Sequence, residues 1–305
     1  MAAIEVDTLF KSYGHVDVLR GVSFRVEVGE VFALLGPNGA GKTTTLEILE
    51  GHNRRSGGRV MVLGVDPQAG GRALRERIGI VLQSAGIDGE LTVREVLSLY
   101  RSFYPHPLAA AELIGLVGLE EKRRARVKTL SGGQRRRLDL ALALVGDPEL
   151  IFLDEPTIGF DPEARREAWQ LLERLRALGR TIVLTSHYMD EVSHLADRAV
   201  VLAGGRVVAE GTPDALGGRT PHETVIRFRL PGTHRPDELP PALLQLVESL
   251  GGELVLRTTQ PTRVLACLCD WALTRSIELR ALEVERPSLE DVYLQLTEAN
   301  HDGGG

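Results

Sequence analysis

The hydrophobic positions of the first 220 residues follow two patterns. Apolar and polar side chains alternate near the N-terminus, which predicts antiparallel strands with one buried face. The apolar positions are Ile4 and Val6, and then Val22, Phe24, Val26 and Val28. Four later runs are almost wholly apolar, at residues 31–36, 78–83, 150–155 and 181–187. Such runs are typical of parallel strands covered on both faces, and amphipathic helices separate them. The order predicts an α/β domain with a mostly parallel sheet and an antiparallel β subdomain.

Helix boundaries also carry local signals, most clearly at residues 162–178. The apolar positions there recur at helical spacing, at Ala164, Ala168, Leu171, Leu175 and Leu178. Asp161 is placed to cap the start of this helix, Pro162 fits its first turn and Gly179 fits its end. We therefore expect a helix that begins directly after Asp161.

A domain boundary is expected where residues 211–223 gather glycine, proline and threonine. We assign residues 1–215 to the α/β domain, with a helical subdomain at about 84–145, and residues 216–305 to a C-terminal domain. The C-terminal elements are predicted as strand 224–230, helix 241–252, strands 253–259 and 262–268, helix 270–277 and strand 279–285. This β-α-β-β-α-β order indicates a small α+β, ferredoxin-like domain.

Composition limits the possible functions. The 305 residues carry a net charge of -6, which argues against broad electrostatic binding to nucleic acid. No apolar run approaches the roughly 18 residues of a membrane-spanning helix, and the opening residues do not resemble a signal peptide. Any membrane role is therefore expected to depend on a partner. Cys267 and Cys269 lie two apart in an expected strand and are interpreted as core residues rather than metal ligands.

A phosphate-binding loop is the most specific local motif. The sequence GPNGAGKT, from Gly36 to Thr43, fits the pattern G-x-x-x-x-G-K-[ST] between an apolar strand and a helix. Its glycines allow backbone N–H groups to surround a phosphate, Lys42 is expected to reach the β- and γ-phosphates, and the Thr43 hydroxyl is expected to bind Mg²⁺. The expected nucleotide-binding residues here are Gly36, Pro37, Asn38, Gly39, Ala40, Gly41, Lys42, Thr43 and Thr44.

Polar residues end the other apolar runs. Gln83 follows the second run, Asp154 and Glu155 the third, and His187 the fourth. Ligands of open α/β sheets bind beyond the carboxyl ends of the strands, so one nucleotide could meet all of them. We expect Asp154 to help hold Mg²⁺, Glu155 to act as general base on water, and His187 to donate to the γ-phosphate. Gln83 is expected to contact Mg²⁺ or the attacking water.

The stretch TLSGGQRRRLD, residues 129–139, suggests a second anion site. Ser131 and Gln134 fit a capping box at a helix start. Gly132 and Gly133 each cost a helix about 1 kcal/mol relative to alanine, but they leave a bare first turn suited to anion contact. The following arginines are spaced by about 100° and do not form a nucleic-acid stripe. Since the phosphate loop already supplies one complete phosphate site, this turn needs a second phosphate or one held by another chain.

Together, these motifs resemble the nucleotide-binding subunits of ATP-binding cassette (ABC) transporters, which have the P-loop NTPase fold. The order and spacing of the phosphate loop, Gln83, LSGGQ, LIFLDEP and His187 carry the resemblance over residues 3–220. It implies an ATPase with ATP and Mg²⁺ as cofactors, working as a head-to-tail homodimer. Ser131, Gly132, Gly133 and Gln134 would contact the partner's γ-phosphate, Tyr13 would stack on adenine, and Asp161 would communicate across the dimer.

Finer details are similar to the branch that pairs with ABC-2-type permeases, such as the daunorubicin-resistance ATPases. These details are the segments TIGFDP and RPSLEDVYLQLTE, Ala143 where an arginine is common, and the extra C-terminal domain, which implies a regulatory or dimer-supporting role. The resemblance implies an exporter subunit at the cytoplasmic face of the cell membrane, bound to a separate permease, with drugs or other hydrophobic compounds as cargo.

Three alternatives remain open from the sequence. One is an exporter subunit for lipid or polysaccharide cargo. Another is a soluble cassette ATPase acting on ribosomes or DNA, although such proteins usually carry two cassettes, long coiled coils or zinc motifs. The third is a non-catalytic nucleotide-binding regulator, against which the intact Lys42, Asp154, Glu155 and His187 argue.

Overall fold

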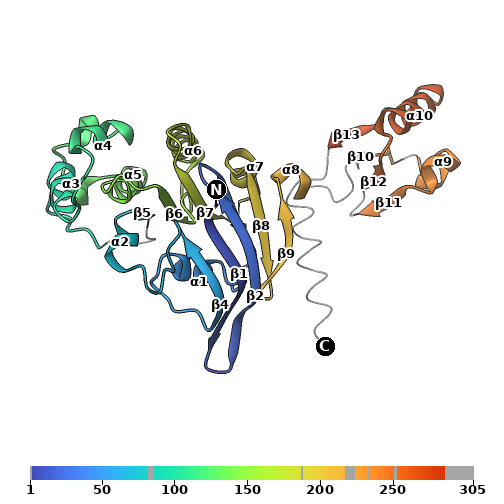
Figure 1. Ribbon diagram of the computed structural model, residues 1–305. Coiled ribbons are helices and arrows are strands. Elements are labelled where there is room, and N and C mark those ends of the chain that lie inside the picture. The colour runs from blue at the N-terminus through green and yellow to red at the C-terminus, as the bar shows by residue number, and fades with distance from the viewer. Residues whose placement is uncertain are drawn as a thin grey trace. The chain divides into compact units, whose positions relative to one another are not determined.

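The computed structural model describes residues 2–81, 86–186, 188–216, 224–232, 234–250 and 253–285. These residues form two units, which divide after Pro213 (Figure 1). The domain limits predicted from the sequence, at 215 and 216, stay a prediction.

The central sheet of the first unit has the strand order β5-β6-β7-β3-β8-β9. Its strands are β3 (Val31–Leu35), β5 (Ile78–Val81), β6 (Leu150–Asp154), β7 (Thr181–Ser186), β8 (Arg198–Ala203) and β9 (Arg206–Gly211). All neighbours pair in parallel except β8 and β9. The four apolar runs are thus confirmed as parallel strands, and their carboxyl ends meet at one edge of the sheet.

A second, antiparallel sheet covers one face of the first. Its strands are β1 (Ala2–Tyr13), β2 (Val16–Glu27) and β4 (Gly57–Val62), in the order β2-β1-β4. The helix α1 (Lys42–Leu49) contributes Leu46, Ile48 and Leu49 to the core shared by the two sheets. The alternating pattern near the N-terminus is confirmed for Ile4, Val6, Val22, Phe24 and Val26, which are buried in this core. Val28 is exposed, because it lies beyond the end of β2.

Helices make up the remainder of the first unit. They are α2 (Gly71–Arg75), α3 (Val93–Arg101), α4 (Ala110–Leu116), the short 3-10 helices η1 (Glu120–Lys122) and η2 (Val127–Thr129), α5 (Gly132–Ala143), α6 (Pro162–Ala177) and α7 (Met189–Leu195), and the short helix α8 (Pro213–Leu216) begins where this unit ends. Figure 1 shows α3, α4 and α5 grouped beyond the β5 edge, which confirms the helical insertion. Over the part of the chain that the structure describes, no helix combines the length and apolarity that crossing a bilayer requires.

The second unit has the predicted element order with different boundaries. It contains β10 (Thr224–Arg229), η3 (Pro236–Glu238), α9 (Pro241–Leu244), β11 (Val247–Leu250), β12 (Glu253–Thr258), α10 (Pro261–Thr274) and β13 (Arg280–Glu285). Its antiparallel sheet has the order β11-β12-β10-β13, with the first and third strands of the motif at the centre. The ferredoxin-like order is confirmed.

Two element predictions in this unit were wrong. Residues 262–268 belong to the helix α10 and not to a strand, so Cys267 and Cys269 lie on a helix and are half-buried. Val264, Leu268 and Trp271 recur at helical spacing across the whole of α10 and pack into the core of the unit. The predicted helix 241–252 is shorter, because its second half forms β11.

Candidate nucleotide site

The phosphate loop joins β3 to α1 at the carboxyl edge of the central sheet. Gly39 and Gly41 have φ values of 81° and 102°, in the left-handed region that favours glycine. The Lys42 side chain is 6% exposed and folds back along the loop. Its Nζ donates hydrogen bonds to the carbonyls of Gly36 at 2.6 Å and Pro37 at 3.2 Å. Two carbonyls of the loop therefore hold the ammonium group of Lys42 in place.

Asp154 lies at the end of β6 and faces the start of α1. The Thr43 hydroxyl donates to Oδ2 of Asp154 at 3.3 Å, and the Thr185 hydroxyl of β7 donates to Oδ1 at 2.5 Å. Three segments far apart in the sequence therefore place oxygen atoms together, as the sequence predicted for Thr43 and Asp154. Thr185 was not predicted, and its only signal was a hydroxyl near the end of an apolar run.

Glu155 follows in an unusual backbone conformation. Its φ is 48°, in the left-handed region that non-glycine residues rarely adopt. Its N–H donates to the Thr185 hydroxyl at 2.9 Å, so Thr185 contacts both acidic residues. The side chains of Glu155 and Asp154 are near enough to Lys42 to oppose the lowering of its pKa by burial. The structure thus brings Lys42, Thr43, Asp154 and Glu155 to one place.

Two further predicted residues, Gln83 and His187, lie outside the described residues. Their roles stay predictions. The described neighbours are β5, which ends at Val81, and β7, which ends at Ser186. Both strands end at the same edge of the sheet as β6.

A buried carboxyl group near this site was not predicted. Glu50, which follows α1, is 8% exposed. Burial raises the pKa of Glu50 to about 7, with further contributions from the negative charges of Asp154 and Glu47. Its position after an apolar helical segment gave no indication that its carboxyl group would be buried.

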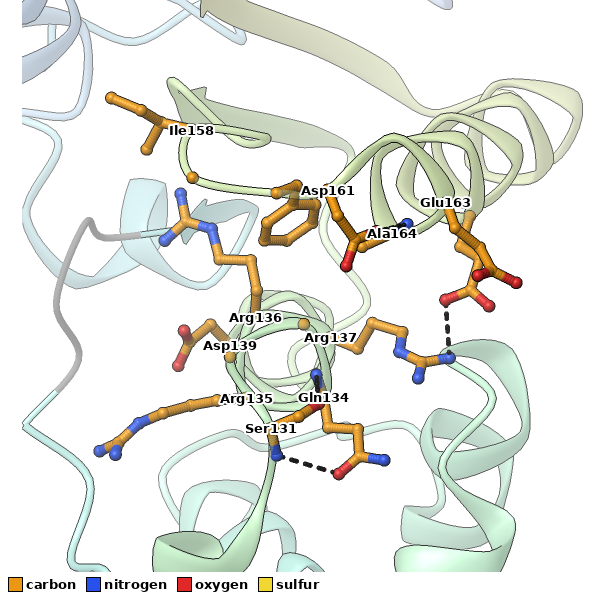
Figure 2. A pocket seen from close by; sticks show the side chains of 15 residues that line it. Ser131, Gln134, Arg135, Arg136, Arg137, Asp139, Ile158, Asp161, Glu163 and Ala164 are labelled. Atoms are coloured by element: carbon orange, nitrogen blue, oxygen red, sulfur yellow. Dashed lines mark hydrogen bonds and ion pairs between the residues drawn. The ribbon is translucent and has the colours of Figure 1, made fainter.

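A separate open cavity of 680 Å³ lies at the start of α5. Figure 2 shows its walls, which come from the first turns of α5 and from the segment that leads into α6. Ser131 caps α5 as predicted: its hydroxyl accepts from Gln134 N–H at 3.3 Å, and Gln134 Oε1 accepts from Ser131 N–H at 3.1 Å. Leu138, Ala141 and Leu142 form the buried face of α5, and Val145 beyond its end is buried as well.

Nothing in the described residues explains why glycine stands at position 132. A Cβ atom built at this position would meet nothing within 4 Å, and its backbone is not in the left-handed region. At Gly133 the nearest contact of such an atom would be the Cβ of Ala164, at an ordinary 3.6 Å. Neither local strain nor internal packing in the described residues requires these two glycines.

The three arginines after Gln134 take separate directions, as Figure 2 shows. Arg135 is exposed, and Arg137 pairs with Glu167 of α6 at 3.4 Å. Arg136 is half-buried and extends toward the segment after β6. The predicted fan of arginines is confirmed, but the destination of Arg136 was not predicted.

Tyr13 and Asp161 complete the predicted set. Tyr13 is 48% exposed, with Lys11 Nζ at 4.4 Å from its ring centroid, and Asn53 donates to its hydroxyl. An exposed ring is open to stacking. Asp161 lines the cavity and caps α6, with its Oδ1 accepting from Ala164 N–H at 2.8 Å. The predicted cap of α6 is therefore confirmed.

Comparisons with known proteins agree with the geometry. A family model described as "ABC transporter" matches residues 19–158, and one described as "ABC transporter domain-containing protein-like, C-terminal domain" matches residues 224–288. The chain is 42% identical to the Nod factor export ATP-binding protein I of Paraburkholderia xenovorans, over 97% of both chains. It is 40% identical to the protein of that name from Rhizobium etli, over 97% of this chain and 94% of the relative. A bacterial ABC transporter cassette solved as a dimer superimposes with a TM-score of 0.61 and 27% identity, covering 68% of this chain and 98% of the cassette.

Proposed function

This chain belongs to the ATP-binding subunits of ABC transporters, and from that premise we propose that it powers an exporter through a separate ABC-2-type permease. The chain is an ATPase of the P-loop NTPase fold and binds ATP. The observation that carries the proposal is the meeting of Lys42, Thr43, Asp154 and Glu155 at one sheet edge, while the Ser131 cavity opens elsewhere. The first group fits the chain's own ATP, and the second fits the ATP of another copy.

The roles within the first group follow from charge and position. The Lys42 ammonium now donates to loop carbonyls and would turn to the β- and γ-phosphates of ATP. Glu155 is the proposed general base, taking a proton from the attacking water. His187 is proposed to donate to the γ-phosphate and Gln83 to contact the water. Tyr13 is proposed to stack on the adenine ring.

Mg²⁺ fits the oxygen atoms that the chain provides. Thr43 and Asp154 place a hydroxyl and a carboxylate 3.3 Å apart beside the phosphate loop. Mg²⁺ commonly takes one or two protein ligands and completes its shell with water and substrate phosphates. When bound, it would neutralise negative charge on the phosphates. We assign Thr43 and Asp154 to it, with Gln83 as a third candidate ligand.

The second group supports a homodimer. Gly132 has open space around it, so the packing of the described residues would allow a side chain in the first turn of α5. Bare N–H groups at a helix start bind anions well, and a phosphate brought by a second copy would use them. Ser131, Gly132, Gly133 and Gln134 would then close over the partner's ATP, with Asp161 at the same cavity.

The substitution Glu155→Gln tests this assignment. General-base catalysis contributes about 10²- to 10⁴-fold, so we expect kcat for ATP hydrolysis to fall at least about 100-fold. ATP affinity should stay the same, and ATP-bound dimers should accumulate in size-exclusion chromatography. Glu112→Gln is the matched control, since it removes an exposed carboxylate from α4 that belongs to neither group. Full ATPase activity in Glu155→Gln would exclude Glu155 as the base.

The membrane partner and the cargo need separate experiments. We propose that the chain lies at the cytoplasmic face of the cell membrane on a permease with about six apolar segments of about 20 residues each. Copurification with such a protein would support this placement, and a chain that purifies without any membrane protein would contradict it. Drugs or other hydrophobic compounds are the proposed cargo. The named relatives act in Nod factor export, which favours Nod factor-like compounds as the second candidate.

A further inference from the structure

Arg136 connects the helix α5 to the segment that holds Glu155. Its Nε donates to the carbonyl of Pro156 and its Nη2 to the carbonyl of Asp154, each at 3.3 Å. Figure 2 shows the side chain rising from α5 toward the loop that carries Ile158. One guanidinium therefore contacts the backbone on both sides of Glu155.

The contacted backbone is strained at its centre. Glu155 has a φ of 48°, a conformation that non-glycine residues rarely adopt. Such conformations persist only where surrounding contacts hold them. The Thr185 hydroxyl, which accepts from Glu155 N–H, supplies one contact, and Arg136 supplies two more. The direction of the Glu155 side chain therefore depends on groups outside its own segment.

The charge of Arg136 is only partly solvated. Burial lowers the pKa of its guanidinium, and the negative charges of Asp139 and Asp154 oppose that change. Asp139 lies one helical turn further along α5, with its own pKa raised to about 6 by burial. A half-buried cation with two carboxylates near it has a defined position, unlike the exposed Arg135 next to it.

We propose that Arg136 is a positioning residue that links α5 to Glu155 within one chain. This inference rests on the function proposed above. The start of α5, at Ser131, would meet the partner's ATP, whereas Glu155 would act on the chain's own ATP. Because Arg136 lies on the second turn of the same helix, engagement of one ATP would set the backbone around the base for the other. The two ATP sites of a dimer are thereby coupled through each chain.

The first test measures kinetics in homodimers of the full chain. Arg136→Met should lower kcat for ATP hydrolysis about 10-fold or more and leave KM for ATP within about twofold, because the residue positions the base and does not hold ATP. Arg136→Lys, which restores a positive charge and donors, should recover part of kcat. A rise in KM with unchanged kcat would overturn the proposal.

The second test separates action within a chain from action across the dimer. Two differently tagged full-length chains are coexpressed and purified through both tags, and ATP hydrolysis is followed in a single turnover. One chain carries Glu155→Gln, so that only the Glu155 of the other chain remains. Arg136→Met is then placed either on the chain with Glu155→Gln or on the opposite chain.

The proposal expects loss of the single-turnover rate only when the Arg136 substitution lies opposite Glu155→Gln. On the same chain it should be silent, because the Glu155 that it positions is already inactive. Equal rates in both arrangements, or loss only on the same chain, would overturn the proposal, and Arg136→Lys repeats the comparison should the methionine variant misfold. Failure of the proposed function itself would show differently, as ATPase activity in the Glu155→Gln homodimer.

Discussion

The phosphate loop and the start of α5 are both proposed to meet phosphate, but only the first is enclosed by its own chain. Lys42 is 6% exposed and donates to two loop carbonyls. Ser131 and Gly132 are exposed at a cavity of 680 Å³. A residue that is buried and hydrogen-bonded within its own chain, such as Lys42, takes its position from that chain alone. For the exposed glycine turn, which internal packing does not require, we propose a ligand held by a second copy of the chain.

The largest effect is expected at the phosphate loop, where removal of the Lys42 ammonium group should weaken ATP binding. Lys42→Ala deletes an ammonium group that would contact two phosphates, and hydrogen bonds to charged groups contribute about 1.5–3 kcal/mol each. ATP affinity should fall at least about 100-fold in isothermal titration calorimetry. Lys122→Ala, at an exposed position in η1, is the control and should bind ATP normally. Binding within threefold of the wild type in Lys42→Ala would place the phosphates elsewhere.

The pH dependence of stability compares two carboxyl groups removed from solvent, Glu50 after α1 and Asp139 on α5. The pKa of Glu50 is raised from 4.5 to about 7, so the folded protein holds a proton that the unfolded chain releases. This contribution to stability is complete below pH 4.5 and is lost as pH rises through about 7, at most about 3 kcal/mol in total. Glu50→Gln should remove that dependence from the free energy of unfolding, measured without nucleotide in urea.

Asp139, on α5, is the second carboxyl group of this comparison. Its pKa is raised from 3.8 to about 6, mainly by burial and against the opposing charges of Arg136 and Arg135. Asp139→Asn should therefore remove a smaller loss of stability, between about pH 4 and pH 6. A pH dependence of the unfolding free energy that is the same in each variant as in the wild type would contradict the two assignments.

The smallest effect is expected when the cap at the start of α5 or of α3 is removed. Ser131 and Thr92 each form a complete capping box, at α5 and α3. Replacing either by alanine should cost about 1 kcal/mol of stability, measured by thermal unfolding. Only Ser131→Ala should also weaken ATP-driven dimerisation, by about 10-fold in analytical ultracentrifugation. Equal dimerisation of the two variants would remove Ser131 from the contact with the partner's ATP.

The sequence predicted best those features that depend on near neighbours. The capping box of Ser131 and Gln134 and the cap of α6 by Asp161 involve residues three apart, and both were found as expected. The parallel strands were also predictable, because burial on both faces leaves an apolar run. Their shared edge then brought Thr43 and Asp154 together, as topology requires.

Short apolar segments in the second unit were less predictable. The run VLACLC suits a strand by its local composition, yet it lies inside α10. The helix is shown only by the spacing of Val264, Leu268 and Trp271, which lie three or four residues apart. This spacing places all three side chains in the core of the unit. The same ambiguity shortened the helix expected at 241–252, where the chain extends into β11.

By itself the sequence determined the motifs and the parallel sheet, because these depend on local spacing and on runs of apolar residues, and it predicted two turns that would bind phosphate. Only the tertiary structure decided that Glu50 is buried, that Thr185 bonds to Asp154, and that Arg136 reaches the backbone around Glu155. The physical reason is distance along the chain. A buried charge or a long side chain takes its role from partners that folding brings within hydrogen-bond range, and no local pattern names those partners.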